Sequence, residues 1–301
     1  MLITAVIPTK NRPDDLERAV ASVCAQSRRP DELLVIDQSA DEISRERAVR
    51  AVAANGGAME LAYVCDPGIP GLVAAKKAAV ARARGDIICF LEDDIVLEPD
   101  YLSSIERGFI RDPQMMGCCG VVTNLPPLPP FYVRLFHFFH RGIFRDPRVG
   151  VYGAAKSAGL PLIKSDYLSG GLSAYRRQVF DAIAFDVHND LFMLEDIDFS
   201  TRAALRFGER FYINPDARLQ HRMSPVNRAV LAPRQRRKLR EFLVFYKKRR
   251  GTRGAGAALL LLLVGLLIEA AYQALQARHL SPIIGYFVGL WDGLRWPVAR
   301  E

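Results

Sequence analysis

The chain has 301 residues, half of them hydrophobic, which is enough to build one large or two smaller folded domains. Its five cysteines are an odd number without CxxC spacing, which argues against a disulfide framework and favours buried, reduced thiols in the cytosol. Residues 234–253 hold ten Lys and Arg against one Glu, so they account for the whole net charge of +8 and leave the rest near neutral. Such a basic block binds something anionic or is simply solvated.

Apolar runs and amphipathic segments alternate through the first half of the chain. The N-terminal run has no basic flank and is expected to be a strand rather than a secretion signal. The order predicts a Rossmann-like, mostly parallel α/β sheet flanked by helices, with ligands beyond the carboxyl ends of the strands. The predicted strands are Leu2–Ile7, Leu33–Ile36, Leu61–Cys65 and Ile87–Leu91, and the helices between them are Asp14–Gln26, Ser44–Ala54 and Leu72–Ala83.

The second half is less regular. A helix is predicted at Tyr101–Ile110 and another at Ile197–Phe207. Residues 125–150 combine prolines, aromatics and basic side chains, and they give no clear pattern of helix or strand. Further strands are predicted at Met116–Val122, Leu168–Tyr175 and Arg210–Ile213.

Acidic residues follow two of the predicted strands. Asp37 ends the second, and Glu92, Asp93 and Asp94 follow the fourth. Carboxylates crowded at a buried strand end repel one another unless a cation lies among them. Mg²⁺ and Mn²⁺ take oxygen ligands and commonly bind through few carboxylates together with substrate phosphates. A divalent metal ion holding a diphosphate is therefore one interpretation, and a solvated turn is the simpler one.

Four other features bear on the chemistry. The loop after the first strand, PTKNRP, has no GxGxxG pattern, which argues against a nicotinamide-dependent dehydrogenase. The acids in 191-LFMLEDIDFSTRA-203 either stabilise the start of a helix or supply a general base, Asp196. His221 follows an apolar segment and is either structural or a metal ligand. The pair Gly170 and Gly171 permits a tight turn or a close approach of backbone to a ligand.

The order and spacing of these motifs resemble those of the inverting glycosyltransferases of family 2, over roughly residues 1–250. The resemblance implies a GT-A fold, Mn²⁺ or Mg²⁺ as cofactor, and Asp196 as the catalytic base. It implies that the metal ligands are Asp94 and His221, and that Gly170, Gly171 and Glu195 lie on the acceptor or diphosphate side. The implied nucleotide-binding residues are Pro8, Thr9, Arg12, Asp37, Lys76 and Asp93.

Two positions depart from the family pattern. Lys76 and Lys77 stand where Arg and Asn are common, and Glu92 stands where the first Asp of a D-x-D motif is usual. The side chain of Glu92 is longer than that of the usual Asp. The alternatives for its carboxylate are contact with the ribose, contact with the metal, or contact with neither. By the resemblance, residues 1–233 form the catalytic domain, with a nucleotide-sugar half at about 1–115 and an acceptor half at about 116–233. The basic segment 234–254 and apolar, membrane-associated helices in 255–301 follow.

The C-terminal segments raise the question of a membrane. Residues 255–268 are uncharged and largely apolar, but a spanning helix needs about 20 residues and Glu269 interrupts the run. With 283–298 and 125–150, this segment favours peripheral or re-entrant association with the cytoplasmic face of the inner (plasma) membrane, whose anionic surface would attract the basic block. For the C-terminal segments, spanning, packing on the catalytic body and oligomer formation are the alternatives, and residues 125–150 could equally form a lid over the acceptor cleft.

The predicted function is metal-assisted transfer of a sugar from a nucleotide-sugar donor to a glycan or a polyprenyl-linked acceptor, with inversion at the anomeric carbon. A sugar nucleotidyltransferase is an alternative, although PTKNRP is not the Gly-rich loop expected there. A non-catalytic protein that binds anionic lipid or nucleic acid is another, but the basic charge is confined to one segment, so nucleic acid is not the expected partner.

Overall fold

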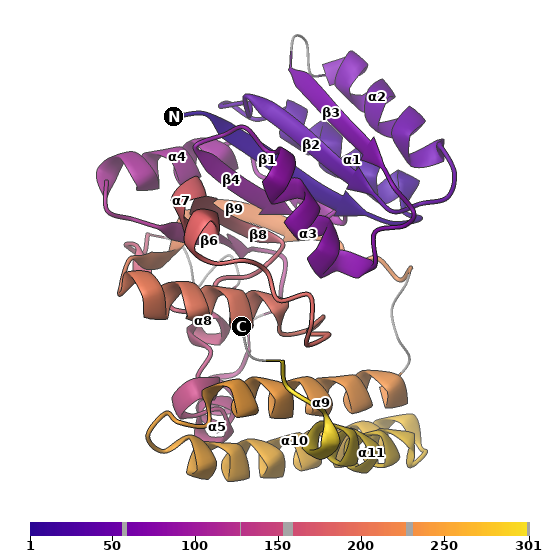
Figure 1. The fold of residues 1–301 in the computed structure, drawn as a ribbon, viewed down its shortest axis with the longest axis vertical. Coiled ribbons are helices and arrows are strands. Elements are labelled where there is room, and N and C mark those ends of the chain that lie inside the picture. Colours follow the sequence, from indigo (N-terminus) through magenta and orange to yellow (C-terminus); the bar gives the residue numbers. More distant parts are fainter. Residues whose placement is uncertain (56–58, 127, 153–158, 227–230, 300–301) are drawn as a thin grey trace. The chain divides into compact units, whose positions relative to one another are not determined.

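The computed structural model describes residues 1–55, 59–126, 128–152, 159–226 and 231–299 (Figure 1). Contacts divide the chain into two compact units. The first contains residues 1–127, 150–185 and 199–226, and the second contains residues 128–149, 186–198 and 227–301. Each unit is therefore assembled from segments that are distant in the sequence.

The first unit is built on one mostly parallel sheet. In the described residues, nine strands are joined in the order β3-β2-β1-β4-β8-β6-β9-β5, and β7 pairs with β9. Strands β1 to β4 are parallel to one another, whereas β8 runs antiparallel to both β4 and β6. The strands are β1 (Ile3–Thr9), β2 (Glu32–Asp37), β3 (Glu60–Cys65), β4 (Ile87–Leu91), β5 (Ile95–Leu97), β6 (Gly117–Val122), β7 (Ile163–Lys164), β8 (Leu172–Arg176) and β9 (Phe211–His221).

Helices cover this sheet because its central strands are predominantly apolar. Every residue of β1, β2 and β4 is buried, as expected for strands covered on both faces. α1 begins with Pro13 at its first turn and buries Leu16, Val20 and Val23, which are spaced to share one helical face. The helices of this part are α1 (Pro13–Cys24), α2 (Ile43–Asn55), α3 (Gly71–Arg82), α4 (Tyr101–Arg111), α7 (Arg177–Ala182) and most of α8 (Glu195–Phe207).

The order of the parallel strands creates a switch point between β1 and β4. From β1 the chain moves outward to β2 and β3, then returns through α3 to β4 on the other side of β1. Ligands in open α/β sheets bind where the connections from two neighbouring strands lead in opposite directions, outside the carboxyl ends of those strands. Thr9 ends β1 at this point, and the acidic turn at residues 92–94 follows β4.

The second unit is helical. It contains α5 (Pro130–Phe139), the short η1 (Gly142–Phe144), α9 (Leu231–Arg249), α10 (Ala255–Ala277) and α11 (Ser281–Arg295), while η2 (Pro147–Gly150) ends at the unit boundary. α11 packs closely on α9 through glycines four residues apart, Gly285 and Gly289. A Cβ at 285 would lie 2.5 Å from the carbonyl oxygen of Ala232, so only glycine permits this approach.

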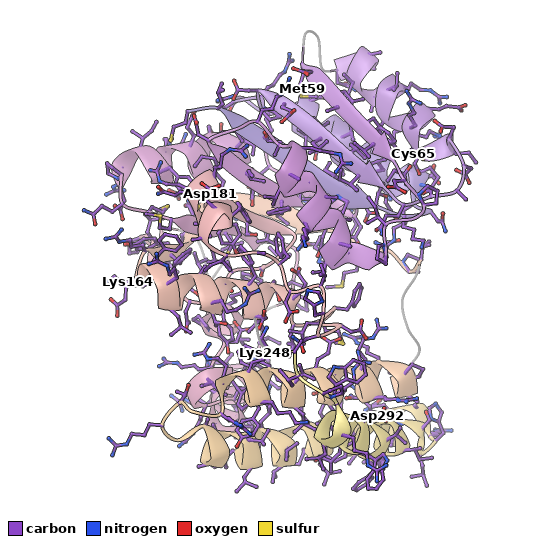
Figure 2. The ribbon with its side chains drawn as sticks, viewed as in Figure 1. Met59, Cys65, Lys164, Asp181, Lys248 and Asp292 are labelled. Atoms are coloured by element: carbon purple, nitrogen blue, oxygen red, sulfur yellow. The ribbon has the colours of Figure 1, made fainter. Side chains whose placement is uncertain are left out.

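Most of the basic segment lies in the helix α9, and part of its charge is compensated by carboxylates. Four of its basic residues pair with carboxylates of the same unit, and Lys248 is one of them. Another is Arg236, whose Nε lies 2.5 Å from Oδ2 of Asp292; Figure 2 labels Lys248 and Asp292. Glu269, expected to interrupt the apolar run of α10, has its Oε2 2.6 Å from Nζ of Lys238. The sequence did not predict α9 or α5 as helices, and β9 is longer than expected.

Candidate active site

The side chain of Asp93 lies beside the end of β1. Its Oδ2 accepts a hydrogen bond of 2.8 Å from Oγ1 of Thr9, and its Oδ1 lies 2.9 Å from Nη1 of Arg12. Burial raises the pKa of Asp93 to about 6, although Arg12 and Thr9 act in the opposite direction. Asp93 thus joins the two strand ends of the switch point, and three residues predicted to bind the nucleotide meet there.

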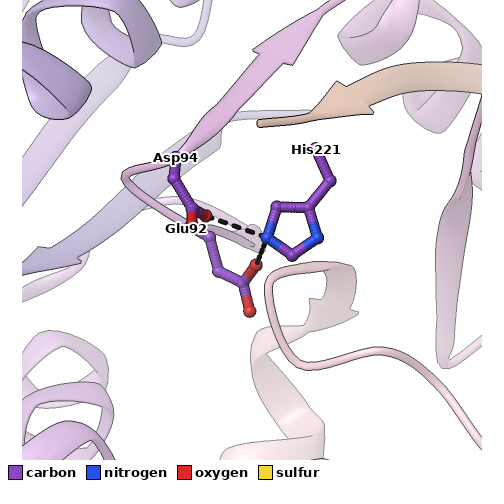
Figure 3. A group of neighbouring side chains, drawn as sticks. All are labelled: Glu92, Asp94 and His221. Atoms are coloured by element: carbon purple, nitrogen blue, oxygen red, sulfur yellow. Dashed lines mark ion pairs between the residues drawn. The ribbon is translucent and has the colours of Figure 1, made fainter. Parts of the chain in front are cut away.

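Glu92 and Asp94 turn to a different partner, His221 (Figure 3). Nε2 of His221 lies 3.0 Å from Oδ1 of Asp94 and 3.2 Å from Oε2 of Glu92. One ligand atom from each of the three residues lies within 4.8 Å of the others. Burial alone would raise the pKa of Asp94, but the hydrogen bond and charge of His221, the Ser224 amide and Arg12 together hold it below its ordinary value.

Strand pairing brings His221 to the acidic turn. β5 starts directly after the turn and runs antiparallel to β9, with Ile95 opposite His221. Beyond β9, the amide of Ser224 donates a hydrogen bond of 2.8 Å to Oδ2 of Asp94. The amide of Arg222 donates one of 2.7 Å to the carbonyl oxygen of Asp94. Asp94 is therefore fixed in both its backbone and its side chain.

The glycine pair predicted before β8 also meets the acidic turn. The carbonyl oxygen of Gly171 accepts a hydrogen bond of 3.0 Å from the amide of Glu92. A Cβ at position 171 would overlap the side chain of Glu92, with Oε1 only 2.5 Å away. The absence of a side chain at Gly171 therefore leaves room for the carboxylate of Glu92 beside His221.

The cluster of Glu92, Asp94 and His221 fits a divalent metal ion. Its two carboxylates and one imidazole suit Mn²⁺, and Mg²⁺ also takes carboxylate oxygens. Asp94 is 4 % exposed in its side chain, whereas Glu92 is 41 % exposed. A buried ligand and a solvent-facing ligand are compatible with an ion that also binds a substrate phosphate.

The other residues predicted on the nucleotide side have internal partners. Pro8 is buried in β1. Asp37 is fully buried, and its oxygens accept hydrogen bonds of 2.6 Å from the hydroxyl of Tyr63 and 2.8 Å from the amide of Ser39. Lys76, in α3, donates a hydrogen bond of 3.0 Å to the carbonyl oxygen of Gly170. Contact of Asp37 and Lys76 with a nucleotide stays a prediction.

Asp196 and Glu195 belong to the second unit, at the start of α8. Oδ2 of Asp196 lies 2.9 Å from Nη1 of Arg148, and its side chain is 17 % exposed. Arg148 is itself held by Asp146, which accepts hydrogen bonds of 2.9 Å from Nε and 2.8 Å from Nη2. Asp196 is thus oriented by an arginine that is already fixed, and it keeps access to solvent.

Sequence reasoning missed three parts of this arrangement. Arg148 lies in the stretch 125–150, whose basic residues gave no hint of a carboxylate partner almost fifty positions away. The dependence of Glu92 on Gly171 requires the pairing of β4 with β8, which no local pattern reveals. Glu241, buried in the basic segment, contacts the chain just before Glu195.

A scan of protein-family models matches residues 4–184 to the glycosyl transferase family 2. The chain belongs to this family. It is therefore a glycosyltransferase, and the alternatives of a nucleotidyltransferase and of a non-catalytic binding protein are set aside. The matched range of this glycosyltransferase includes the acidic turn and the glycine pair, and it ends before Asp196 and His221.

Solved structures resemble the glycosyltransferase along almost its whole length. A mannosyltransferase from Pyrobaculum calidifontis, PcManGT, solved with GDP-Man and Mn²⁺, is 17 % identical, with a TM-score of 0.63 over 97 % of this chain and 87 % of that one. S. aureus TarS 1–349 in complex with UDP-GlcNAc is 16 % identical, with a TM-score of 0.59 over 99 % and 82 %. These likenesses confirm the predicted GT-A fold. Among curated proteins, no match is found.

Proposed function

We propose that the protein transfers a sugar from a nucleotide-sugar donor to a hydroxyl of a glycan or polyprenyl-linked acceptor, with inversion at the anomeric carbon. The observation that carries the proposal is the cluster of Glu92, Asp94 and His221 after β4 of a family 2 domain. Structures of the same fold were solved with GDP-Man and Mn²⁺ and with UDP-GlcNAc, which supports a nucleoside diphosphate sugar as the donor.

On the donor side, Glu92, Asp94 and His221 would hold Mn²⁺ or Mg²⁺. When bound, the ion would neutralise negative charge on the diphosphate leaving group. Thr9, Arg12 and the buried Asp93 form a connected group at the neighbouring strand ends, suited to bind the nucleoside. Pro8, Asp37 and Lys76 complete the proposed nucleotide site, and Gly170 and Gly171 border it.

On the acceptor side, Asp196 would serve as the general base. It accepts the proton of the acceptor hydroxyl while the hydroxyl oxygen forms a bond to the anomeric carbon. The bond between this carbon and the diphosphate oxygen breaks, and the nucleoside diphosphate leaves with the electron pair. Arg148 keeps the carboxylate of Asp196 oriented, and Glu195 lies beside it. Orientation of this kind supplies much of the rate in displacement reactions.

The base assignment is tested with Asp196→Asn. We expect transfer to be lost while nucleotide-sugar affinity, measured by calorimetry with Mn²⁺, stays close to that of the unaltered protein. Asp181→Asn, which removes an exposed carboxylate in α7, is the matched control and should retain both. Equal loss of transfer and donor binding in Asp196→Asn would refute the assignment. A panel of GDP- and UDP-sugars, tested for thermal stabilisation with and without Mn²⁺, identifies the donor.

We also propose that the protein works at the cytoplasmic face of the inner membrane, bound peripherally or as a re-entrant structure. α10 is long and apolar enough to cross a membrane, by length and composition, and only 28 % of its most apolar window is buried. Exposed apolar side chains recur along the helices of the second unit, among them Phe131 in α5, Leu260 in α10 and Trp291 in α11. Exposed arginines between α9 and α10 would meet anionic headgroups.

Liposome sedimentation tests this localisation. Leu260→Glu should reduce binding to vesicles that contain an anionic phospholipid, because it places a charge on an apolar helix face. Leu205→Glu is the matched control, since Leu205 and Leu260 are both 68 % exposed and Leu205 lies in the first unit. A protein that stays in the supernatant at physiological salt would refute the proposal. If Leu260→Glu changes the oligomeric state but not lipid binding, the apolar face is a contact between copies of the chain.

A further inference from the structure

Glu241 is a carboxylate in the middle of an otherwise apolar helix face. It lies in α9, has no exposed surface, and is followed by the buried residues Phe242 to Phe245. Its Oε2 accepts hydrogen bonds from two consecutive backbone amides, 2.7 Å from Met193 and 3.0 Å from Leu194. Residues 193 and 194 immediately precede the acidic pair Glu195 and Asp196.

A buried carboxylate at position 241 costs free energy of folding unless it accepts the hydrogen bonds of these amides. Its Oε1 is buried and has no hydrogen-bond partner among the described residues. The neighbouring cations pair elsewhere, because Nη2 of Arg240 lies 2.6 Å from Asp190 and Nζ of Lys248 lies 2.6 Å from Asp186. Burial raises the pKa of Glu241 to about 7, while the amides lower it. A proton on Oε1 would leave Oε2 free to accept both hydrogen bonds.

The two amides control the start of α8. The carbonyl oxygen of Leu194 accepts the hydrogen bond of the Asp198 amide at 2.8 Å, which closes the first turn. Asp196 sits inside that turn, so the direction of its carboxylate follows from the backbone at 193–194. Arg148 holds the tip of the same side chain. The backbone is thus fixed by Glu241 and the carboxylate by Arg148.

We propose that Glu241 is a positioning residue for glycosyl transfer: by holding the amides of Met193 and Leu194, it sets the orientation of Asp196. The inference rests on the proposed role of Asp196 as base. The same helix holds both flanks of this segment, because Arg240 pairs with Asp190, and Lys248 pairs with Asp198 at 2.7 Å. α9 therefore supports residues 186–198 as well as contributing to the helical unit.

Two variants distinguish the length of the Glu241 side chain from its ability to ionise. Glu241→Gln keeps an oxygen at the same reach, so transfer should stay within about threefold of the unaltered enzyme. Glu241→Asp keeps the carboxyl group but shortens the side chain by one methylene, so kcat should fall about 10–100-fold while the KM of the donor stays unchanged. Hydrogen exchange at the amides of residues 193 and 194 should accelerate in Glu241→Asp and not in Glu241→Gln.

Leu262→Ala is the control for a merely structural role. It opens a cavity at a fully buried position of α10 and should lower the melting temperature without lowering kcat per folded molecule. The inference is overturned if Glu241→Asp retains kcat while Asp196→Asn is inactive, or if Leu262→Ala loses kcat to the same extent. Activity of Asp196→Asn would instead overturn the base assignment and this inference with it.

Discussion

Replacing Gly171 with alanine should weaken metal binding although Gly171 contributes no ligand. The new Cβ would overlap the side chain of Glu92 and force it to rotate away from His221. Glu92 is 41 % exposed, so it can turn toward solvent and the sheet need not open. Displacing one support of a metal ligand typically costs about 10–100-fold in affinity, which corresponds to about 1.4–2.7 kcal/mol.

Calorimetric titration with Mn²⁺ measures this effect directly. Gly150→Ala is the matched control, because a Cβ at position 150 would meet no atom within 4 Å. If Gly171→Ala acts through Glu92, the double variant with Glu92→Gln should bind Mn²⁺ no more weakly than Glu92→Gln alone. Additive losses would refute this reasoning, and so would a Gly171→Ala protein that binds Mn²⁺ like Gly150→Ala.

Three further predictions concern the acidic turn after β4, the ion pairs of Lys248, and the buried Glu241. Asp94→Asn should lower Mn²⁺ affinity at least about tenfold, whereas Asp93→Asn, whose carboxylate contacts a different group, should mainly lower nucleotide affinity; calorimetry distinguishes the two. Lys248→Met should cost about 3–5 kcal/mol in urea denaturation because it removes the cation that pairs with two buried aspartates, and Lys164→Met, from an exposed pair, should change little. The pKa of Glu241 is about 7 in the folded protein against an ordinary 4.5, so the fold retains a proton that the unfolded chain releases. The free energy of unfolding should therefore fall by about 3 kcal/mol as the pH rises from about 4.5 to about 7, and Glu241→Gln should remove this pH dependence.

The first four strands and their helices were predictable because their signals are local. Ile87–Leu91 is a strand at the predicted boundaries, since a continuous apolar run between a glycine and an acidic turn has few other solutions. The position of the carboxylates at the ligand edge followed from the parallel order alone. The family resemblance then supplied the grouping with His221, which the antiparallel pairing of β5 and β9 brings about.

The helical unit was less predictable because its charges are satisfied by distant partners. Residues 234–253 resemble a solvated or anion-binding block, yet Glu241 is buried and Lys248 joins two aspartates far back in the sequence. α5 is aromatic or aliphatic at most of its positions, so no alternation of apolar and polar residues marked it as a helix. Pairings between remote side chains leave no periodic trace in a single sequence.

The inclusion of residues 186–198 in the helical unit matters for any attempt to shorten this protein. A chain that ends after residue 226 would retain all the strands described above and the cluster at His221. It would nevertheless lose Glu241, Arg240 and Lys248, the partners of the segment that carries Asp196. We expect such a chain to bind its donor but to transfer sugar poorly, in which case α9 would be part of the machinery for turnover and could not be removed together with the apolar helices that follow it.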